Sequence, residues 1–341
     1  MTLSTAPLRF AASLQNDRPV SENIADARRA EDLGYAEVWA NESGHGRGVF
    51  TELGAVASST TSIGLGIGIV NPFHRHPSVI AMEAATLDEL SGGRLRLGLG
   101  ASIWNLRHLG EADARTARPY TATIEAVQII RAMLHGTPSI ASTVFEVSPA
   151  THLDFAPVRP DLPVYLGPVN RRMLVGAGAY ADGVELGAIM SVGYVSFALG
   201  LIAEGALGQG RDPAALDIAA PLMTAVAADG ATARAAVKAP LAYYLYRVED
   251  VVVDRSGADP GAISRVRAEV AEHGAEAGAQ LVTDELIDTF AVAGTPDHAV
   301  ARFREYAGAG IRGLIVQFVP GLDRAQGLEL VAKEVVPNVG N

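Results

Sequence analysis

The chain has no cysteine among its 341 residues. Without thiols it forms no disulfide, iron–sulfur cluster, thiolate nucleophile or cysteine zinc site. Any redox chemistry therefore depends on a bound organic cofactor. The sequence also lacks the G-x-x-x-x-G-K-[ST] and G-x-S-x-G patterns, and with them the usual phosphate loop and hydrolase serine.

Positive charge is scarce, with 27 Lys and Arg residues against 38 Asp and Glu residues and a net charge of -11 at pH 7. This balance disfavours nucleic acid and an anionic membrane as partners. No run of 18 apolar residues occurs, and the segment MTLSTAPLRF lacks the charged and apolar regions of a signal peptide, so we expect a cytoplasmic protein. With 49% hydrophobic residues, the chain has the material for a large core.

Short apolar segments rich in β-forming residues alternate with longer helical patterns. The segment SENIADARRAEDLG predicts a helix with Ser21 as its N-cap and Gly34 at its end, and a further helix is expected to begin at Pro77. Eight strands are predicted: Leu8 to Leu14, Ala36 to Ala40, Ser62 to Val70, Leu95 to Gly100, Val164 to Gly167, Gly183 to Leu186, Leu216 to Ala227, and Gly313 to Val319.

Eight alternations of strand and helix favour a closed (β/α)8 barrel, the TIM barrel, with an open doubly wound sheet as the alternative. Residues 103–161 and 232–284 are too long for one helix and predict insertions after strands 4 and 7. In a barrel, such insertions follow the strands on the face that carries active sites. No linker rich in proline, glycine or serine is visible, so a single domain over residues 1–341 is expected.

Two short patterns resemble sites that their context disfavours. The segment GAGAYADG contains G-x-G-x-x-A, but here a helical segment precedes the glycines and the strand GVEL follows, which is the reverse of a dinucleotide site. The segment His74-Arg75-His76 offers two imidazoles to a metal. Residues two apart in an extended segment point in opposite directions, which favours a loop role.

Polar side chains gather after two predicted strands. The segment VWANESGHGR brings Glu42, His45 and Arg47 to the expected mouth of the barrel, where they are either site residues or a solvated loop. The segment YLGPVNRRM opens a helix with Arg171 and Arg172, which predicts either a phosphate seat or two surface arginines.

The third predicted strand, in the segment IGLGIGIVNPFHRHP, alternates glycine with large aliphatic residues. Gly64, Gly66 and Gly68 therefore share one face, which indicates a close approach by another group. Only Gly68 stands at the carboxyl end of the strand, where a barrel binds its ligand. Asn71 and Pro72 end the strand, because proline has no N–H for the next ladder bond.

Four long segments together resemble the bacterial luciferase-like family, and most closely its methylenetetrahydromethanopterin reductase branch. They are LGYAEVWANES, GLGIGIVNPFHRHPSVIAMEAATLDELSGGRLRLGLG, PVYLGPVNRRMLVGAGAYADGVEL and FAVAGTPDHAVARFREYAGAGIRGLIVQF. The resemblance implies a (β/α)8 barrel, usually a homodimer or higher homo-oligomer, with FMN or coenzyme F420 at its mouth. In the nearest branch the cofactor is the deazaflavin F420.

The resemblance also implies site residues. Glu42 is the expected acid after the second strand, and Ser43 stands where many members carry a histidine, so His45 is the candidate to replace it. Ala101 stands where the sugar dehydrogenase branch has a glutamate. The residues expected at the cofactor are Gly68, Ile69, Val70 and Asn71 after the third strand, Ala101 and Ser102 after the fourth, and Gly167, Pro168, Val169 and Arg171 after the fifth.

These expectations define the predicted function. We expect an F420-dependent oxidoreductase that moves a hydride between the deazaflavin and a small organic substrate. The alternatives are an FMN-dependent monooxygenase and a cofactor-binding barrel without turnover. The resemblance further predicts a bulge at Gly68 with a cis Gly68-Ile69 peptide bond, which would press the backbone against one face of the cofactor ring.

Overall fold

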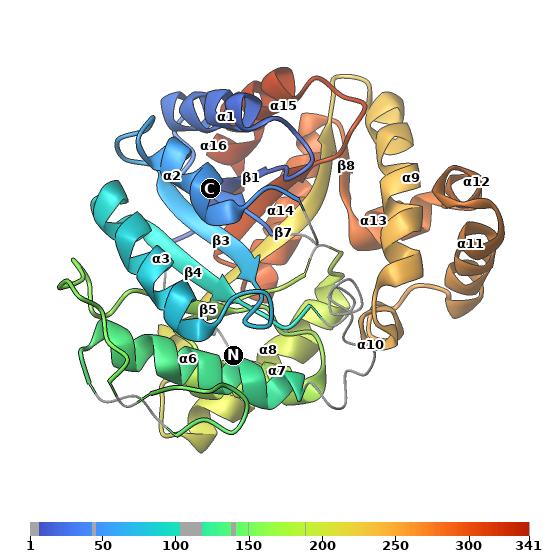
Figure 1. Cartoon of the computed structure of the whole chain (residues 1–341). Coiled ribbons are helices and arrows are strands. Elements are labelled where there is room, and N and C mark those ends of the chain that lie inside the picture. The colour runs from blue at the N-terminus through green and yellow to red at the C-terminus, as the bar shows by residue number, and fades with distance from the viewer. Residues whose placement is uncertain are drawn as a thin grey trace.

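A computed structural model of the chain describes residues 7–42, 46–102, 118–137, 141–148, 150–187 and 189–340. Within them, eight parallel strands form a barrel that is surrounded by helices, as the sequence predicted (Figure 1). The barrel strands are β1 (Arg9–Leu14), β2 (Glu37–Ala40), β3 (Gly64–Val70), β4 (Leu95–Leu99), β5 (Val164–Leu166), β6 (Gly183–Glu185), β7 (Asp217–Val226) and β9 (Gly313–Phe318).

The barrel is closed because β6 pairs with β7, and β9 lies between β7 and β1. Closure rules out the open doubly wound sheet. A further strand, β8 (Val292–Gly294), pairs with the last residues of β7 outside the barrel and was not predicted. Its three residues are too few to show a period of two.

Most of the helices cover the outside of the barrel. The helix α1 begins at Val20 after Pro19, without a side-chain cap, so the prediction of Ser21 as N-cap was wrong, whereas α3 does begin at Pro77. The covering helices are α1 (Val20–Asp32), α2 (Val49–Ala57), α3 (Pro77–Ser91), α6 (Pro119–Leu134), α7 (Arg171–Tyr180), α8 (Val192–Gly208), α14 (Pro296–Ala309), α15 (Arg324–Leu330) and α16 (Val336–Val339).

The insertion after β7 forms a lobe beside the barrel mouth, at the right of Figure 1. It consists of α9 (Gly230–Arg247), α10 (Asp250–Asp254), α11 (Pro260–His273), α12 (Ala275–Ala279) and α13 (Asp284–Phe290). Buried residues such as Val237, Leu241 and Val266 belong to an apolar cluster of its own beside that of the barrel. The single-domain organisation of the whole chain stays a prediction. No helix among the described residues is long and apolar enough to cross a bilayer.

The inside of the barrel is filled in layers. At the amino-terminal end, Arg9 lies between Glu37 at 2.8 Å and Asp217 at 2.5 Å. Above them, the rings of Trp39 and Tyr165 meet edge to face with centroids 5.5 Å apart. Among the described residues, these layers fill the amino-terminal end of the barrel, and a ligand site is expected at the carboxyl ends of its strands.

The inward-facing glycines of β3 make room for these layers. A Cβ atom built on Gly66 would lie 2.1 Å from the indole of Trp39, so no larger residue fits there without a shift. The indole in turn donates a hydrogen bond to Glu37 at 2.7 Å. The glycine pattern of this strand thus reflects contacts with side chains inside the barrel.

Candidate active site

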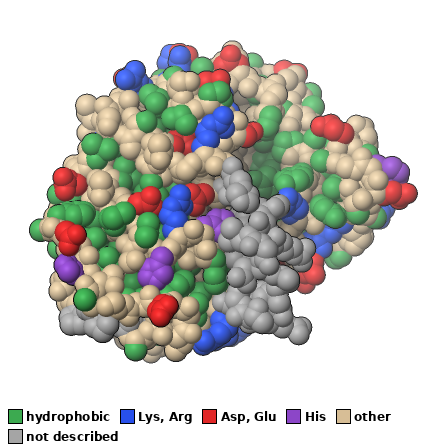
Figure 2. Space-filling model, viewed as in Figure 1, with side chains coloured by type: hydrophobic (Ala, Val, Ile, Leu, Met, Phe, Trp, Pro, Cys, Tyr) green, Lys and Arg blue, Asp and Glu red, His purple; other side chains and the backbone are tan. Residues whose placement is uncertain are grey.

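A cavity of about 910 Å³ lies at the carboxyl ends of the barrel strands. Each barrel strand, or a residue within two positions after its end, contributes to the lining. In strand order these residues include Ser13, Trp39, Gly68, Ala101, Gly167, Glu185, Pro221 and Gln317. In Figure 2 the surface is hollowed between the barrel and the helices of the insertion, and hydrophobic side chains line the hollow.

The strand β3 ends in a bulge that faces this cavity. Its pairing with β4 runs from Ile67 opposite Leu97 to Val70 opposite Leu99, which leaves one extra residue on β3. The Gly68-Ile69 peptide bond is cis, as the family resemblance predicted, and both residues line the cavity. Val70 is fully buried in the barrel wall instead.

Asn71 supports the bulge from behind. Its Nδ2 atom donates a hydrogen bond to the carbonyl oxygen of Ala101 at 2.6 Å, and its Oδ1 accepts one from the N–H of Phe73 at 2.9 Å. Asn71 is buried and does not line the cavity, whereas Ala101 and Ser102 do. Asn71 thus joins the ends of β3 and β4 on the side away from the space for a ligand.

After β2, Glu42 lines the cavity and is held by Arg75. One guanidinium nitrogen of Arg75 lies 2.6 and 2.5 Å from the two carboxylate oxygens of Glu42, and its Nε lies 3.2 Å from Glu83. The side chain of Glu42 is only 7% exposed. His45 and Ser43 lie outside the described residues. Arg47 bonds the backbone of Asn16 at 3.0 Å, and so joins the loops after β1 and β2.

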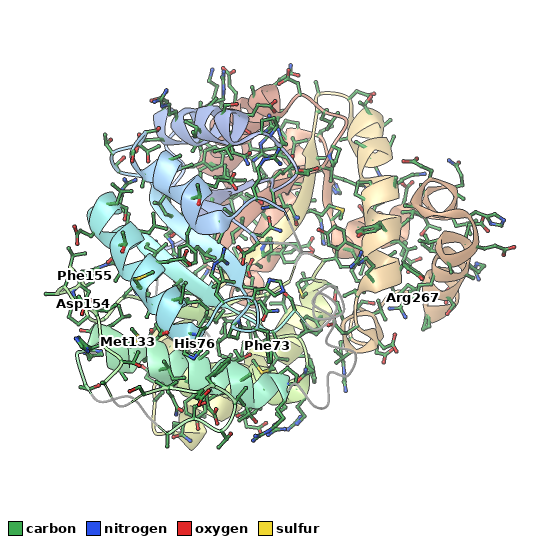
Figure 3. The ribbon with its side chains drawn as sticks, in the orientation of Figure 1. Phe73, His76, Met133, Asp154, Phe155 and Arg267 are labelled. Carbon is green, nitrogen blue, oxygen red and sulfur yellow. The ribbon has the colours of Figure 1, made fainter. Side chains whose placement is uncertain are left out.

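The two histidines beside Arg75 have different surroundings from those of a metal pair. His76 caps α3, since its Nδ1 accepts the N–H of Ser78 at 3.2 Å. Its ring also meets that of Phe145 edge to face, and Phe73 contacts the same phenylalanine. Figure 3 labels His76 and Phe73. Within the part of the chain that is described, no group of three His, Asp or Glu side chains could hold a metal ion.

The loop after β5 and the start of α7 form one wall of the cavity. Gly167, Val169 and Asn170 line it, and the side chain of Asn170 caps α7 by accepting the N–H of Met173 at 3.1 Å. Free N–H groups at a helix start favour an anion. Pro168 lies in this loop without lining the cavity.

Of the two arginines at the start of α7, only Arg172 faces the cavity. Its guanidinium stacks 4.0 Å above the ring of Tyr120. Arg171, which we expected at the cofactor, is instead directed to Glu204 at 3.1 Å on the surface. Successive residues at a helix start point in different directions, and sequence alone does not tell which of the two turns inward.

The end of α9 closes the cavity on the side of the insertion. Tyr244 and Arg247 line it there, neither of which the sequence indicated. Arg267 of α11 fixes this end, since it donates hydrogen bonds to the carbonyl oxygens of Leu245 and Val248, both at 2.8 Å, and pairs with Asp250 (Figure 3). The insertion thus forms part of the cavity wall, and Arg267 fixes the position of this part.

Glu185, at the end of β6, is the lining residue whose surroundings differ most from those of an ordinary surface acid. A Cβ atom on Gly68 would lie 2.6 Å from its Oε1, so the carboxyl group rests against the bulge. Burial without a compensating charge raises the pKa of Glu185 to about 8. An acid inside the apolar strand GVEL was the signal that could have identified it.

Comparison with known proteins places the chain in a family. The family model described as luciferase-like monooxygenase matches residues 2–313. The chain belongs to this luciferase-like family. The 5,10-methylenetetrahydromethanopterin reductase of Methanolobus tindarius is 31% identical over 331 residues, which covers 96% of this chain and 100% of the relative.

Other members of the luciferase-like family agree over the whole length. The structure of the coenzyme F420-dependent tetrahydromethanopterin reductase from Methanopyrus kandleri has a TM-score of 0.89 and 28% identity, and covers 97% of this chain and 99% of that one. The F420-dependent glucose-6-phosphate dehydrogenase of Beutenbergia cavernae is 30% identical over 353 residues, or 97% of each chain. These matches confirm the resemblance drawn from the sequence.

Proposed function

We propose that this luciferase-like protein is a coenzyme F420-dependent oxidoreductase that moves a hydride between the deazaflavin and a small organic substrate. The observation that carries the proposal is the geometry of one cavity, in which the Gly68-Ile69 bulge and the start of α7 both face the same space. The coenzyme joins a planar ring to a phosphate, so its site needs a support for the ring beside a place for an anion. Relatives along the full length of the chain are named as F420-dependent.

The residues present fit such a coenzyme. Gly68 and Ile69 would support one face of the ring, and the backbone of Gly167 and Val169, with Arg172, would take the phosphate at the start of α7. When bound, a deazaflavin supplies a carrier of hydride, that is, of two electrons at once. The opposite face of the ring is left to a substrate.

Glu42 is proposed as the polar group near the reacting atoms. Because Arg75 neutralises it, its carboxylate would orient a donor group of the substrate without the cost of an unpaired buried charge. The wall made by Tyr244 and Arg247 would limit the access of water from the side of the insertion. His45 stays a proposed site residue on the strength of the family resemblance alone.

The choice of coenzyme is the decisive experiment. Purified protein is titrated with F420 and with FMN, and binding is followed by fluorescence quenching. We expect F420 to bind and FMN to bind far more weakly. Tight FMN binding without F420 binding, together with oxygen consumption during turnover, would favour an FMN-dependent monooxygenase. F420 binding without hydride exchange with any substrate would favour the barrel without turnover.

We also propose that the protein works as a homodimer or higher homo-oligomer. Val79, Met82 and Leu90 on the outer side of α3 are 40%, 46% and 53% exposed. Their spacing puts them on one stripe of the helix, which supports a contact with a second copy. The cytoplasmic location expected from the sequence stays a prediction that cell fractionation would test.

A further inference from the structure

The carboxyl group of Glu185 crosses the barrel from β6 to the bulge at the end of β3. A side-chain atom built on Gly68 would lie 2.6 Å from Oε1 and 2.8 Å from Cδ of Glu185. The carboxyl group therefore fills the space that a larger residue at position 68 would need. Since Gly68 and Glu185 both line the cavity, the acid lies at its floor, against the proposed support of the ring.

The other acids inside the barrel are neutralised, and Glu185 is not. Glu37 lies 2.8 Å from Arg9 and 3.1 Å from Arg96, and Asp217 pairs with Arg9 at 2.5 Å. Among the described residues, no group donates a hydrogen bond to Glu185 or forms an ion pair with it. The residue is half-buried, and its carboxyl group faces the cavity. A desolvated carboxyl group without a protein partner lowers stability, so packing alone is a poor reason for an acid at this place.

Charged and titratable groups surround the cavity, but none of those described is paired with Glu185. The titratable residues on the elements that surround it are Glu42 after β2, Arg118 and Tyr120 at the start of α6, Arg172 on α7, Tyr243, Tyr244 and Arg247 on α9, Glu249 before α10 and, in the layers below, Tyr165 and Asp217. Desolvation is the cause that raises its pKa to about 8, with no charged neighbour contributing. Near neutral pH the carboxyl group therefore keeps its proton.

We propose that Glu185 is a catalytic residue that holds a proton at the floor of the cavity and exchanges it with the bound deazaflavin ring. This inference rests on the proposed function. When bound, the deazaflavin would accept a hydride, with its electron pair, from the substrate at a ring carbon, and Glu185 would supply the proton that the reduced ring takes up at its conjugated nitrogen. Glu185 would then regain a proton from solvent, and the oxidised substrate would release its own proton to solvent from the opposite face of the ring, so that one hydride and one proton would have moved and Glu185 would be restored.

The test compares Glu185→Gln, which cannot ionise, with the wild type. F420 binding is titrated between pH 7 and pH 9.5. We expect the affinity of the wild type to fall about tenfold as Glu185 ionises beside the ring, and that of Glu185→Gln to stay level. In single turnovers at pH 7, Glu185→Gln should transfer hydride at least about 100-fold more slowly.

Glu52→Gln is the matched control. Glu52 is also a buried acid whose pKa is raised by desolvation, but Asn23 donates a hydrogen bond to it and it lies on α2, away from the cavity. We expect this variant to keep the binding profile and the hydride transfer of the wild type. Glu185→Asp keeps an acid at the floor and should keep a pH-dependent affinity, and melting curves will show that each variant is folded.

Two outcomes would overturn the inference. The first is that the F420 affinity of the wild type stays level across this pH range. The second is that Glu185→Gln matches the wild type in binding profile and in rate. Either result would mean that Glu185 takes no part in the chemistry, and would leave the proposed function intact. If the wild type binds no F420 at any pH, the proposed function fails as well. The binding of the wild type at pH 7 separates the two cases.

Discussion

At the scale of single residues, the acids of this barrel fall into two groups. Glu37, Asp217 and Glu42 each have an arginine partner, which offsets part of the cost of burying a charge. Glu185 lacks such a partner among the described residues and holds its proton instead. The charges of the first group are paired inside the fold, whereas the unpaired acid of the second lowers stability for a reason that lies in the site.

This difference predicts a pH-dependent gain in stability for Glu185→Gln. From the ordinary range of a glutamate up to about pH 8, the folded wild type holds a proton that the unfolded chain has released, so its free energy of unfolding falls as pH rises. The variant lacks this loss. We expect the wild type and the variant to melt at equal temperatures at pH 5. At pH 8.5 the variant should melt at least about 2 °C higher than the wild type. Equal values at both pH values would contradict the raised pKa.

A second prediction at this scale concerns Glu42. Replacing it with glutamine removes the charge that faces the cavity but keeps its shape, so turnover should fall at least about tenfold while F420 affinity changes little. Glu83→Gln is the control, because Glu83 contacts the same Arg75 without lining the cavity. Steady-state kinetics of the two variants should differ. Equal losses in both would mean that Arg75, rather than Glu42, matters.

At the scale of elements, β3 combines two functions along one face. Its middle glycine, Gly66, leaves room for Trp39, and its last one, Gly68, leaves room for Glu185. Gly66→Ala should lower the free energy of unfolding by about 1–3 kcal/mol, since the added methyl overlaps the indole. Gly68→Ala should weaken F420 binding more than Gly64→Ala does. Urea unfolding measures the first effect, and binding titrations measure the second. A loss of F420 affinity in Gly66→Ala together with a loss of stability in Gly68→Ala would contradict the layered interior.

The elements also show what sequence reasoning can reach. The barrel strands were predicted to within about two residues, because alternating and continuous apolar runs follow from burial. The bulge at Gly68 required the family resemblance, since no local pattern marks a cis bond. Glu185 was missed, and Arg171 was chosen over Arg172 for the cofactor, for another reason. Their importance depends on which residues of distant strands and helices face one space, and that is a property of the closed barrel.

At the scale of the whole molecule, the apolar stripe on α3 predicts how copies assemble. Met82→Glu puts a charge at the centre of the stripe, so we expect it to dissociate a homo-oligomer at micromolar concentration. Leu207→Glu is the control, because Leu207 is equally apolar and 59% exposed but lies on α8. Size-exclusion chromatography with light scattering gives the mass. A monomeric wild type, or an unchanged mass for Met82→Glu, would refute this interface.

The plug of Arg9, Glu37 and Asp217 below the layer of Trp39 and Tyr165 has a consequence for the kinetic order of the reaction. A barrel that is blocked at one end admits both reactants through the same mouth, and in the proposed function the ring lies at the floor beside Gly68. The coenzyme must then enter first and leave last. A saturating substrate should slow the escape of F420 in a chase experiment at least about tenfold, whereas random order predicts an unchanged rate.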